Sequence, residues 1–263
     1  MITVNAINKF FHRGSINEVH SLRELSLDIA EGDFITIIGS NGAGKSTFLS
    51  CLAGTHAVDS GQILVDGQNV TPWPEHKRAR FIGRVFQDPL SGTFSGGTIA
   101  QNMALAAKRG QWRGLGRGVK RTDMALFTER LKTLELGLEN RLKDRVGLLS
   151  GGQRQALTMI MATLVRPRLL LLDEHTAALD PKTAAQILKL TTQIVSGHNL
   201  TTLMVTHNMH QALALGNRLI MMHQGQIILD ARGADKSRLT VESLLDKFQS
   251  LRDADISDRM LLG

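Results

Sequence analysis

One glycine-rich stretch of this sequence has the residue types and spacing that bind the phosphates of a nucleotide. The pattern G-x-x-x-x-G-K-[ST] is matched in full by Gly39-Ser40-Asn41-Gly42-Ala43-Gly44-Lys45-Ser46, and Thr47 follows it. The apolar run 34–38 before it predicts a strand, and residues 46–53 after it predict a helix. Backbone N–H groups and a helix N-terminus would then surround an anion. In such a loop Lys45 reaches the β- and γ-phosphates, and the Ser46 hydroxyl is placed for Mg²⁺.

A second glycine-rich run, Leu149-Ser150-Gly151-Gly152-Gln153, precedes another predicted helix, at 152–164. A helix N-terminus is again suited to an anion, although this one lies far from the first loop in the sequence. Next comes the apolar run 169–172, of strand length, which ends in Asp173 and Glu174. A carboxylate at this strand end suits the metal shell of a nucleotide site, so we assign Asp173 to Mg²⁺ together with Ser46.

Taken together and in this order, the three motifs resemble those of the ATP-binding subunits of ABC transporters, over about residues 1–229. The resemblance implies that Glu174 is the general base that polarises the attacking water. It implies that Gln87 is the glutamine that meets Mg²⁺ or that water, and that His207 contacts the γ-phosphate. Phe11 takes the place of the aromatic residue that stacks on adenine, although Phe10 is adjacent and the assignment could slip by one residue.

The resemblance also implies a homodimer with two composite sites and with ATP and Mg²⁺ as cofactors. Ser150, Gly151 and Gly152 of one copy would cap the γ-phosphate held by the first loop of the other copy. Gln153 would support that second loop, and Asp180, in the run 178–180, would lie at the dimer interface. Separate permease subunits would dock on residues 87–103.

Similarity is greatest to bacterial importers that pair with a lipoprotein substrate-binding component, some of which are thought to carry aromatic amino acids such as tryptophan. One alternative is an exporter or a lipoprotein-release ATPase. The other is a soluble ABC ATPase that acts on ribosomes or DNA, although such proteins usually have two cassettes or a long coiled coil. This chain has one cassette and no sustained heptads.

Two features depart from the expected pattern. His175 stands where the family usually has proline, and we hypothesise a hydrogen bond near Glu174 that gives hydrolysis a modest pH sensitivity. The run Phe94-Ser95-Gly96-Gly97-Thr98 imitates residues 149–153 but lacks the following glutamine, and we expect a flexible turn there.

The amino-acid composition of the chain limits the classes of partner and the cellular location that we expect. The net charge of +7 is dispersed, aromatic residues make up only 4%, and there is no tyrosine, so we expect no nucleic-acid partner. The chain has a single cysteine, Cys51, and no apolar run approaches the ~20 residues of a membrane span. Its first residues do not resemble a secretory signal. We expect a peripheral subunit at the cytoplasmic face of the inner (plasma) membrane.

The elements that must position these residues form an α/β fold, a P-loop NTPase core of the ABC type. Strands that alternate with helices predict a mainly parallel sheet, with an antiparallel β subdomain near the N-terminus and an inserted helical subdomain at about 88–164. Residues 1–229 would form the ATPase domain, and 230–263 a C-terminal helix and tail. The expected strands lie at 2–7, 25–29, 63–67, 82–87, 201–206, 219–223 and 226–229, and further helices start near 98, 122, 181, 209 and 240.

Overall fold

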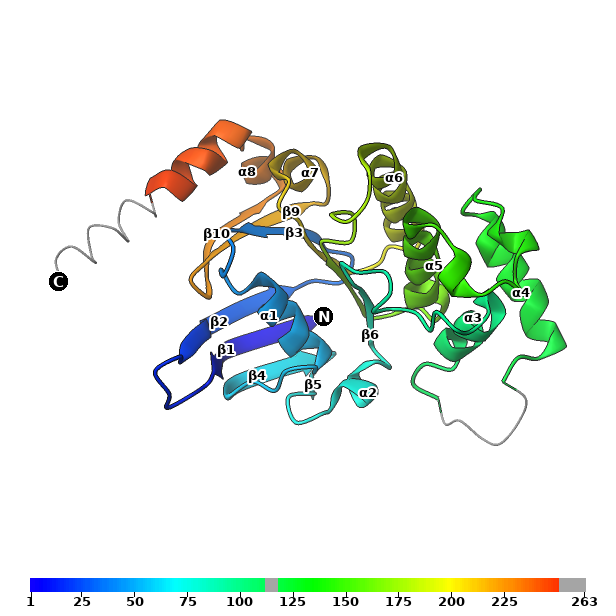
Figure 1. The fold of residues 1–263 in the computed structure, drawn as a ribbon. Coiled ribbons are helices and arrows are strands. Elements are labelled where there is room, and N and C mark those ends of the chain that lie inside the picture. The colour runs from blue at the N-terminus through cyan, green and yellow to red at the C-terminus, as the bar shows by residue number, and fades with distance from the viewer. Residues whose placement is uncertain (112–117, 251–263) are drawn as a thin grey trace.

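The computed structural model describes residues 1–111 and 118–250 of the 263-residue chain. Most of the glycine-rich basic stretch at 110–118 and the expected C-terminal tail lie outside the described residues. Within the described ranges the α/β class is confirmed, with two sheets and a separate group of helices (Figure 1). None of the described helices is long and apolar enough to span a bilayer.

The first sheet is antiparallel and has the strand order β2-β1-β4-β5. Its strands are β1 (Ile2–Phe11), β2 (Val19–Ile29), β4 (Ser60–Val65) and β5 (Gln68–Asn69). β1 and β2 are longer than the alternating patterns predict, because Phe10 and Phe11 still pair with His20 and Val19. The two phenylalanines thus stand at a strand end, where the backbone fixes their positions.

The second sheet has the order β10-β9-β3-β8-β7-β6. β3 (Phe34–Gly39) pairs in parallel with β8 (Thr202–Val205) and β9 (Arg218–His223). β7 (Leu169–Asp173) pairs in parallel with β8 and with β6 (Ile82–Val85), and only β10 (Gln226–Arg232) runs antiparallel. In parallel sheets of this kind the loops at the carboxyl ends of the strands form the binding crevice. The glycine-rich run 39–46, hereafter the P-loop, and Asp173 both follow such ends.

Helix α1 (Lys45–Ala53) lies between the two sheets (Figure 1). Its buried residues Phe48 and Leu49 belong to the same apolar cluster as Val4 of β1 and Ile35 of β3. The short helix α2 (Glu75–Arg78), which the sequence did not predict, lies near the C-terminal end of α1. The buried guanidinium of Arg78 donates to the carbonyls of Cys51 and Leu52 there, which satisfies the last turn of α1.

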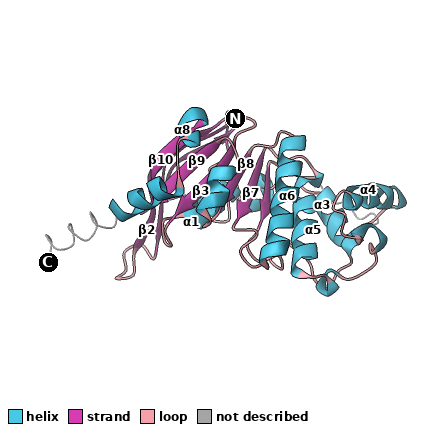
Figure 2. Ribbon diagram, turned by 90° about the horizontal axis from the view of Figure 1, so that it is seen from above, coloured by secondary structure: helices cyan, strands magenta, loops and turns pink. Residues whose placement is uncertain are grey.

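The helical subdomain consists of α3 (Ile99–Ala107), α4 (Arg121–Lys132), two 3-10 turns (Leu138–Asn140 and Val146–Leu148) and α5 (Gly151–Leu164). These helices lie at one end of the molecule, beyond α6 (Pro181–Gly197), and away from β10 (Figure 2). Their apolar cluster includes Met103, Phe127 and Leu157, and the buried Ile187 of α6 belongs to the same cluster. The helical subdomain therefore packs on the rest of the chain through α6.

After β8 the chain continues through α7 (Met209–Ala214), β9, β10 and α8 (Gly233–Ser237), and a last helix covers 241–250. The sequence predicts that this strand ends at Leu229, but β10 continues to Arg232. Leu244 and Phe248 of the last helix pack in a cluster with Ile38 and Met221 of the second sheet. The division of the chain at 229/230 stays a prediction.

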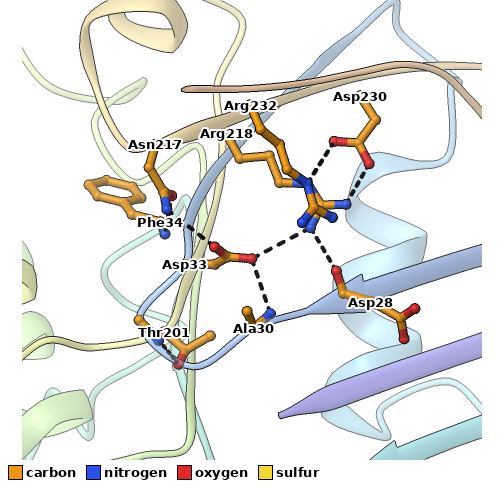
Figure 3. A network of polar contacts seen from close by, with 10 residues as sticks. Asp28, Ala30, Asp33, Phe34, Thr201, Asn217, Arg218, Asp230 and Arg232 are labelled. Carbon is orange, nitrogen blue, oxygen red and sulfur yellow. Dashed lines mark hydrogen bonds and ion pairs between the residues drawn. The ribbon is translucent and has the colours of Figure 1, made fainter. Parts of the chain in front are cut away.

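A buried arginine joins the two sheets. Arg218 of β9 is 1% exposed, and its guanidinium donates to Asp230 of β10 and, at 2.6 Å, to the backbone carbonyl of Asp28 at the end of β2 (Figure 3). Asp33, which precedes β3, lies 3.5 Å from the same guanidinium and accepts from the Ala30 N–H. Buried charge is tolerated where it is paired and hydrogen-bonded, as here. The network fixes the turn from β2 into β3, and hence the approach to the P-loop.

Candidate functional site

The P-loop connects β3 to α1 in a conformation that requires glycine. Gly44, directly before α1, has φ = +94°, and a Cβ atom there would lie 2.5 Å from the backbone oxygen of Ser21. No other residue fits a left-handed backbone in contact with a second strand. The sequence prediction of a strand–loop–helix unit at this position is therefore confirmed.

Lys45 points back over its own loop. Its Nζ donates to the carbonyls of Gly39 at 2.7 Å and Ser40 at 3.0 Å. Burial lowers the pKa of Lys45, and the carboxylates of Glu174 and Asp173 partly oppose that shift. The loop therefore holds a desolvated ammonium group at the position where a nucleotide phosphate would lie.

Ser46 and Asp173 meet although they are far apart in the sequence. The Ser46 Oγ atom donates to Asp173 Oδ1 at 3.1 Å. A hydroxyl and a carboxylate oxygen are hard ligands of the kind Mg²⁺ prefers, and Mg²⁺ usually completes its shell with phosphate oxygens and water. No group of three or more His, Cys, Asp or Glu residues within the described ranges could hold a metal by itself. The pair fits a magnesium ion that arrives with a nucleotide.

Glu174, the next residue, has an unusual backbone. Its φ is +44°, and its N–H donates to the carbonyl of Val205 at the end of β8. Left-handed conformations in non-glycine residues are uncommon and cluster at functional sites. The Glu174 Oε2 atom lies 3.7 Å from Nδ1 of His207, which is two-thirds exposed. The two residues thus stand together above the carboxyl ends of β7 and β8.

The structure contradicts the hypothesis about His175. The side chain is 2% exposed, and its Nε2 lies 3.0 Å from Thr191 Oγ1 of α6, not next to Glu174. The Thr191 hydroxyl donates to the Ile187 carbonyl, so it accepts from an Nε2–H of a neutral imidazole. Burial lowers the pKa of His175 to about 4. A group that stays neutral above pH 5 and points into the core gives hydrolysis no pH sensitivity near neutrality.

The run 149–153, hereafter the signature loop, begins α5 with a capping box. The Ser150 Oγ accepts from the Gln153 N–H, and the Gln153 side chain accepts from the Ser150 N–H. Arg154 braces the loop from behind, since its guanidinium donates to the carbonyls of Val146, Gly147 and Leu149. The loop is therefore rigid before any ligand arrives.

The cavity at the signature loop contains no residue of the P-loop. Ser150, Gly152 and Gln153 line a cavity of about 500 Å³ together with Glu135 and Thr183, and no P-loop residue lines it. The signature loop therefore has an accessible face of its own.

The remaining predicted residues occupy distinct positions. Gln87 is exposed just after β6, where the Phe86 carbonyl accepts from the Gln155 side chain of α5. Asp180 is the N-cap of α6, and its hydrogen bonds with Thr183 lower its pKa.

The two candidate adenine platforms differ in their surroundings. The Phe10 ring is already stacked on His20, with ring centroids 3.9 Å apart, and Arg13 lies over it. The Phe11 ring meets His56 edge-on at 5.3 Å, and Lys9 Nζ lies over it, 5.6 Å from the ring centroid. An aromatic platform needs an uncovered face. Each ring thus contacts one histidine and one cation, and the choice between Phe10 and Phe11 stays open.

The imitation of the signature loop at 94–98 is not a free turn. Thr98 and Gln101 form a capping box that begins α3, and the carbonyls of Ser95 and Gly97 accept from the N–H groups of Gly147 and Val146. The segment is a turn, as expected, because the Gly97 N–H donates to the Phe94 carbonyl. It is not a free one, since the bonds to Val146 and Gly147 tie it to the chain that leads into the signature loop.

Two arginines that the sequence reasoning missed contact the predicted site. Arg154 follows Gln153 directly, and this position was the signal that could have indicated its bracing contacts. Arg84 of β6 lies 3.4 Å from Asp173 Oδ2. That contact follows from the pairing of β6 with β7, which no local pattern reveals.

The parallel sheet, the P-loop and the carboxylates at the strand end define the class of this protein, a P-loop nucleotide-binding α/β protein. Comparison with known sequences narrows it further. The sequence profile of the family described as ABC transporter matches residues 22–177. The chain therefore belongs to the ABC transporter family, and it is an ATP-binding, ATP-hydrolysing subunit.

Relatives and solved structures agree with this. A tyrosine transport ATP-binding protein of Clostridioides difficile is 44% identical over 95% of this chain and 99% of that protein. A methionine import ATP-binding protein of Vibrio vulnificus is 35% identical over 87% of this chain and 64% of that protein. A dimeric post-hydrolysis structure of the ATP-binding cassette MJ0796 with ADP and Pi has a TM-score of 0.74 and 28% identity, over 88% of this chain and 98% of that one.

Proposed function

We propose that two copies of this chain form two composite ATP sites that drive an importer of amino acids. The observation that carries the composite site is the separation described above. The signature loop presents a preorganised helix N-terminus in a cavity that contains no part of its own P-loop. A helix N-terminus in a cavity without the nucleotide loop of its own copy would meet a nucleotide phosphate if a second copy supplied it. The dimeric state of a structural neighbour supports this arrangement.

Within each site the residues divide the chemistry of phosphoryl transfer. Lys45 and the backbone N–H groups of residues 39–47 would bind the phosphates, while Ser46, Asp173 and Gln87 would hold Mg²⁺. The metal supplies charge neutralisation at the phosphates when it is bound. Glu174 would accept a proton from the attacking water, and His207, 3.7 Å from it, would contact the γ-phosphate and keep that carboxylate oriented.

The partners follow from the work such a subunit does. Permease subunits would dock near residues 87–103 and place this chain at the cytoplasmic face of the inner membrane as a peripheral subunit. An extracytoplasmic substrate-binding protein would deliver the cargo. The names of the two relatives support an amino acid as cargo, and the higher identity to the tyrosine transport protein favours an aromatic one.

Uptake measurements test the direction and the cargo. In cells that lack the gene, radiolabelled tyrosine uptake is expected to fall, to recover with the native chain, and not to recover with Glu174→Gln. Methionine uptake serves as the matched control for the second relative. Loss of methionine uptake alone would overturn the aromatic assignment, and accumulation of tyrosine in the mutant cells would indicate export. Co-purification with ribosomes or DNA instead of detergent-solubilised membrane subunits would overturn the transport proposal.

A further inference from the structure

Arg84 reaches from one strand to the carboxylate at the end of the next. It lies on β6, paired with Leu171 of β7, and its Nη2 atom lies 3.4 Å from Asp173 Oδ2. Both side chains are 13% exposed, so solvent screens their attraction only partly. The strand pairing brings this positive charge to Asp173.

The same carboxylate has a second partner. Asp173 Oδ1 accepts from the Ser46 hydroxyl at 3.1 Å, and these two groups are the protein ligands proposed above for Mg²⁺. One oxygen of Asp173 therefore faces the metal position, while the other faces a resident cation. Two cations that share one carboxylate weaken each other's binding, because each reduces the negative charge that the other meets.

Arg84 has other contacts to keep if it leaves Asp173. Its guanidinium lies 3.2 Å from Ser50 Oγ and 3.3 Å from Thr55 Oγ1, both near the C-terminal end of α1, and 4.7 Å from the Phe86 ring centroid. A cavity of about 210 Å³ lined by Arg84, Phe86 and Gly92 adjoins the side chain. The guanidinium thus has both room and hydrogen-bond acceptors away from the carboxylate.

We propose that Arg84 is a positioning residue, a resident counter-cation of Asp173 that sets the Mg²⁺ concentration at which the nucleotide site assembles. The proposal rests on the proposed assignment of Ser46 and Asp173 to the metal. Without Mg²⁺ the ion pair holds the carboxylate beside Ser46 and limits the repulsion between Asp173 and the phosphates. When Mg²⁺ arrives, the pair with Arg84 weakens, and the guanidinium keeps its hydrogen bonds to Ser50 and Thr55.

The test compares Arg84→Met, which removes the charge, with Arg84→Lys, which keeps it. An ATP analogue with nitrogen in place of the β–γ bridging oxygen is held at saturating concentration while free Mg²⁺ is titrated. The readouts are the thermal unfolding midpoint and the fluorescence of a labelled analogue, neither of which depends on turnover. The free Mg²⁺ at half-maximal effect is expected to fall about tenfold in Arg84→Met and to stay within about twofold of the native value in Arg84→Lys.

The outcomes separate this proposal from the one on which it depends. An unchanged or higher Mg²⁺ requirement in Arg84→Met overturns the proposal. A side chain with only a structural role would lower the unfolding midpoint of the ligand-free chain, but it would not shift the Mg²⁺ titration to lower concentration. Arg84→Gln is measured in parallel, so a fold defect in one neutral variant does not decide the result. If the native chain needs no Mg²⁺, or if Asp173→Asn responds to Mg²⁺ like the native chain, the metal assignment itself fails.

Discussion

The burial of His175 makes a quantitative prediction about stability at mildly acidic pH. The imidazole is 2% exposed, its pKa is lowered to about 4 by burial, and an unfolded histidine has a pKa of about 6.5. Because the folded pKa lies below the unfolded one, the unfolded chain takes up the proton first. The stability that neutral His175 contributes is complete above pH 6.5 and is lost as the pH falls toward 4. Linkage gives a loss of about 2 kcal/mol between pH 7 and pH 5.

The perturbation that tests this is His175→Leu. Thr191 keeps a partner in this variant, because its hydroxyl donates to the Ile187 carbonyl at 2.8 Å. Leucine does not titrate, so the free energy of unfolding of the variant should fall between pH 7 and pH 5 by about 2 kcal/mol less than that of the native chain. The difference between the two chains removes the contribution of all other groups.

Urea unfolding at 25 °C, at pH 7, 6 and 5 and without nucleotide, supplies these free energies. His76→Leu is the matched control, because His76 is exposed and its replacement should leave the pH dependence close to that of the native chain. The reasoning is refuted if native chain and His175→Leu lose the same stability between pH 7 and pH 5. The pH–rate profile of hydrolysis between pH 6 and pH 8 should keep its shape in His175→Leu.

Three further predictions concern the loops and the sheet network. Gly44→Ala should abolish nucleotide binding, because its Cβ would lie 2.5 Å from the Ser21 backbone oxygen. A Cβ at Gly42 would have nothing within 4 Å, so Gly42→Ala should lower the free energy of unfolding by only about 1 kcal/mol, through backbone strain. Equilibrium binding of a fluorescent ATP analogue compares the two variants. Arg218→Met should lower the urea-measured free energy of unfolding by about 3 kcal/mol or more, because it removes the cation beside the buried carboxylate of Asp33 and the donor to the Asp28 carbonyl. A loss below about 1 kcal/mol would contradict this. Arg154→Leu should reduce the hydrolysis rate, because it removes the donor to the carbonyls behind the signature loop. The affinity of the monomer for nucleotide should stay within about twofold of the native value. An equal loss of hydrolysis rate and nucleotide affinity would contradict a role of Arg154 in the signature loop alone.

The parts of the site that sequence predicted are those encoded locally. The P-loop follows β3 and precedes α1 because glycines, an apolar run and a helix start occur within a few residues of one another. Gln153 was expected to support the second loop, and in the structure its side chain accepts from the Ser150 N–H in a capping box. Contacts between residues that are close in the sequence do not depend on which distant segments become neighbours in the fold.

The parts that sequence missed depend on which strands become neighbours. The contact of Arg84 with Asp173 needs β6 beside β7, and the partner of His175 needs α6 packed against the chain that follows β7. The imitation of the signature loop at 94–98 looked free because its partners, Val146 and Gly147, lie far along the chain. Tertiary pairing decided each of these cases, and single-sequence patterns do not contain it.

The composite ATP site is the central claim, and the oligomeric state of Glu174→Gln tests it most directly. Removing the base should stop hydrolysis while leaving ATP binding intact, so ATP with Mg²⁺ should convert the variant from monomer to dimer in size-exclusion chromatography with light scattering. Adding Ser150→Arg to the same variant should keep it monomeric, because the signature loop of one copy could no longer reach the phosphate held by the other. A Glu174→Gln chain that binds ATP but stays monomeric, or a dimer that persists with Ser150→Arg, would contradict the claim.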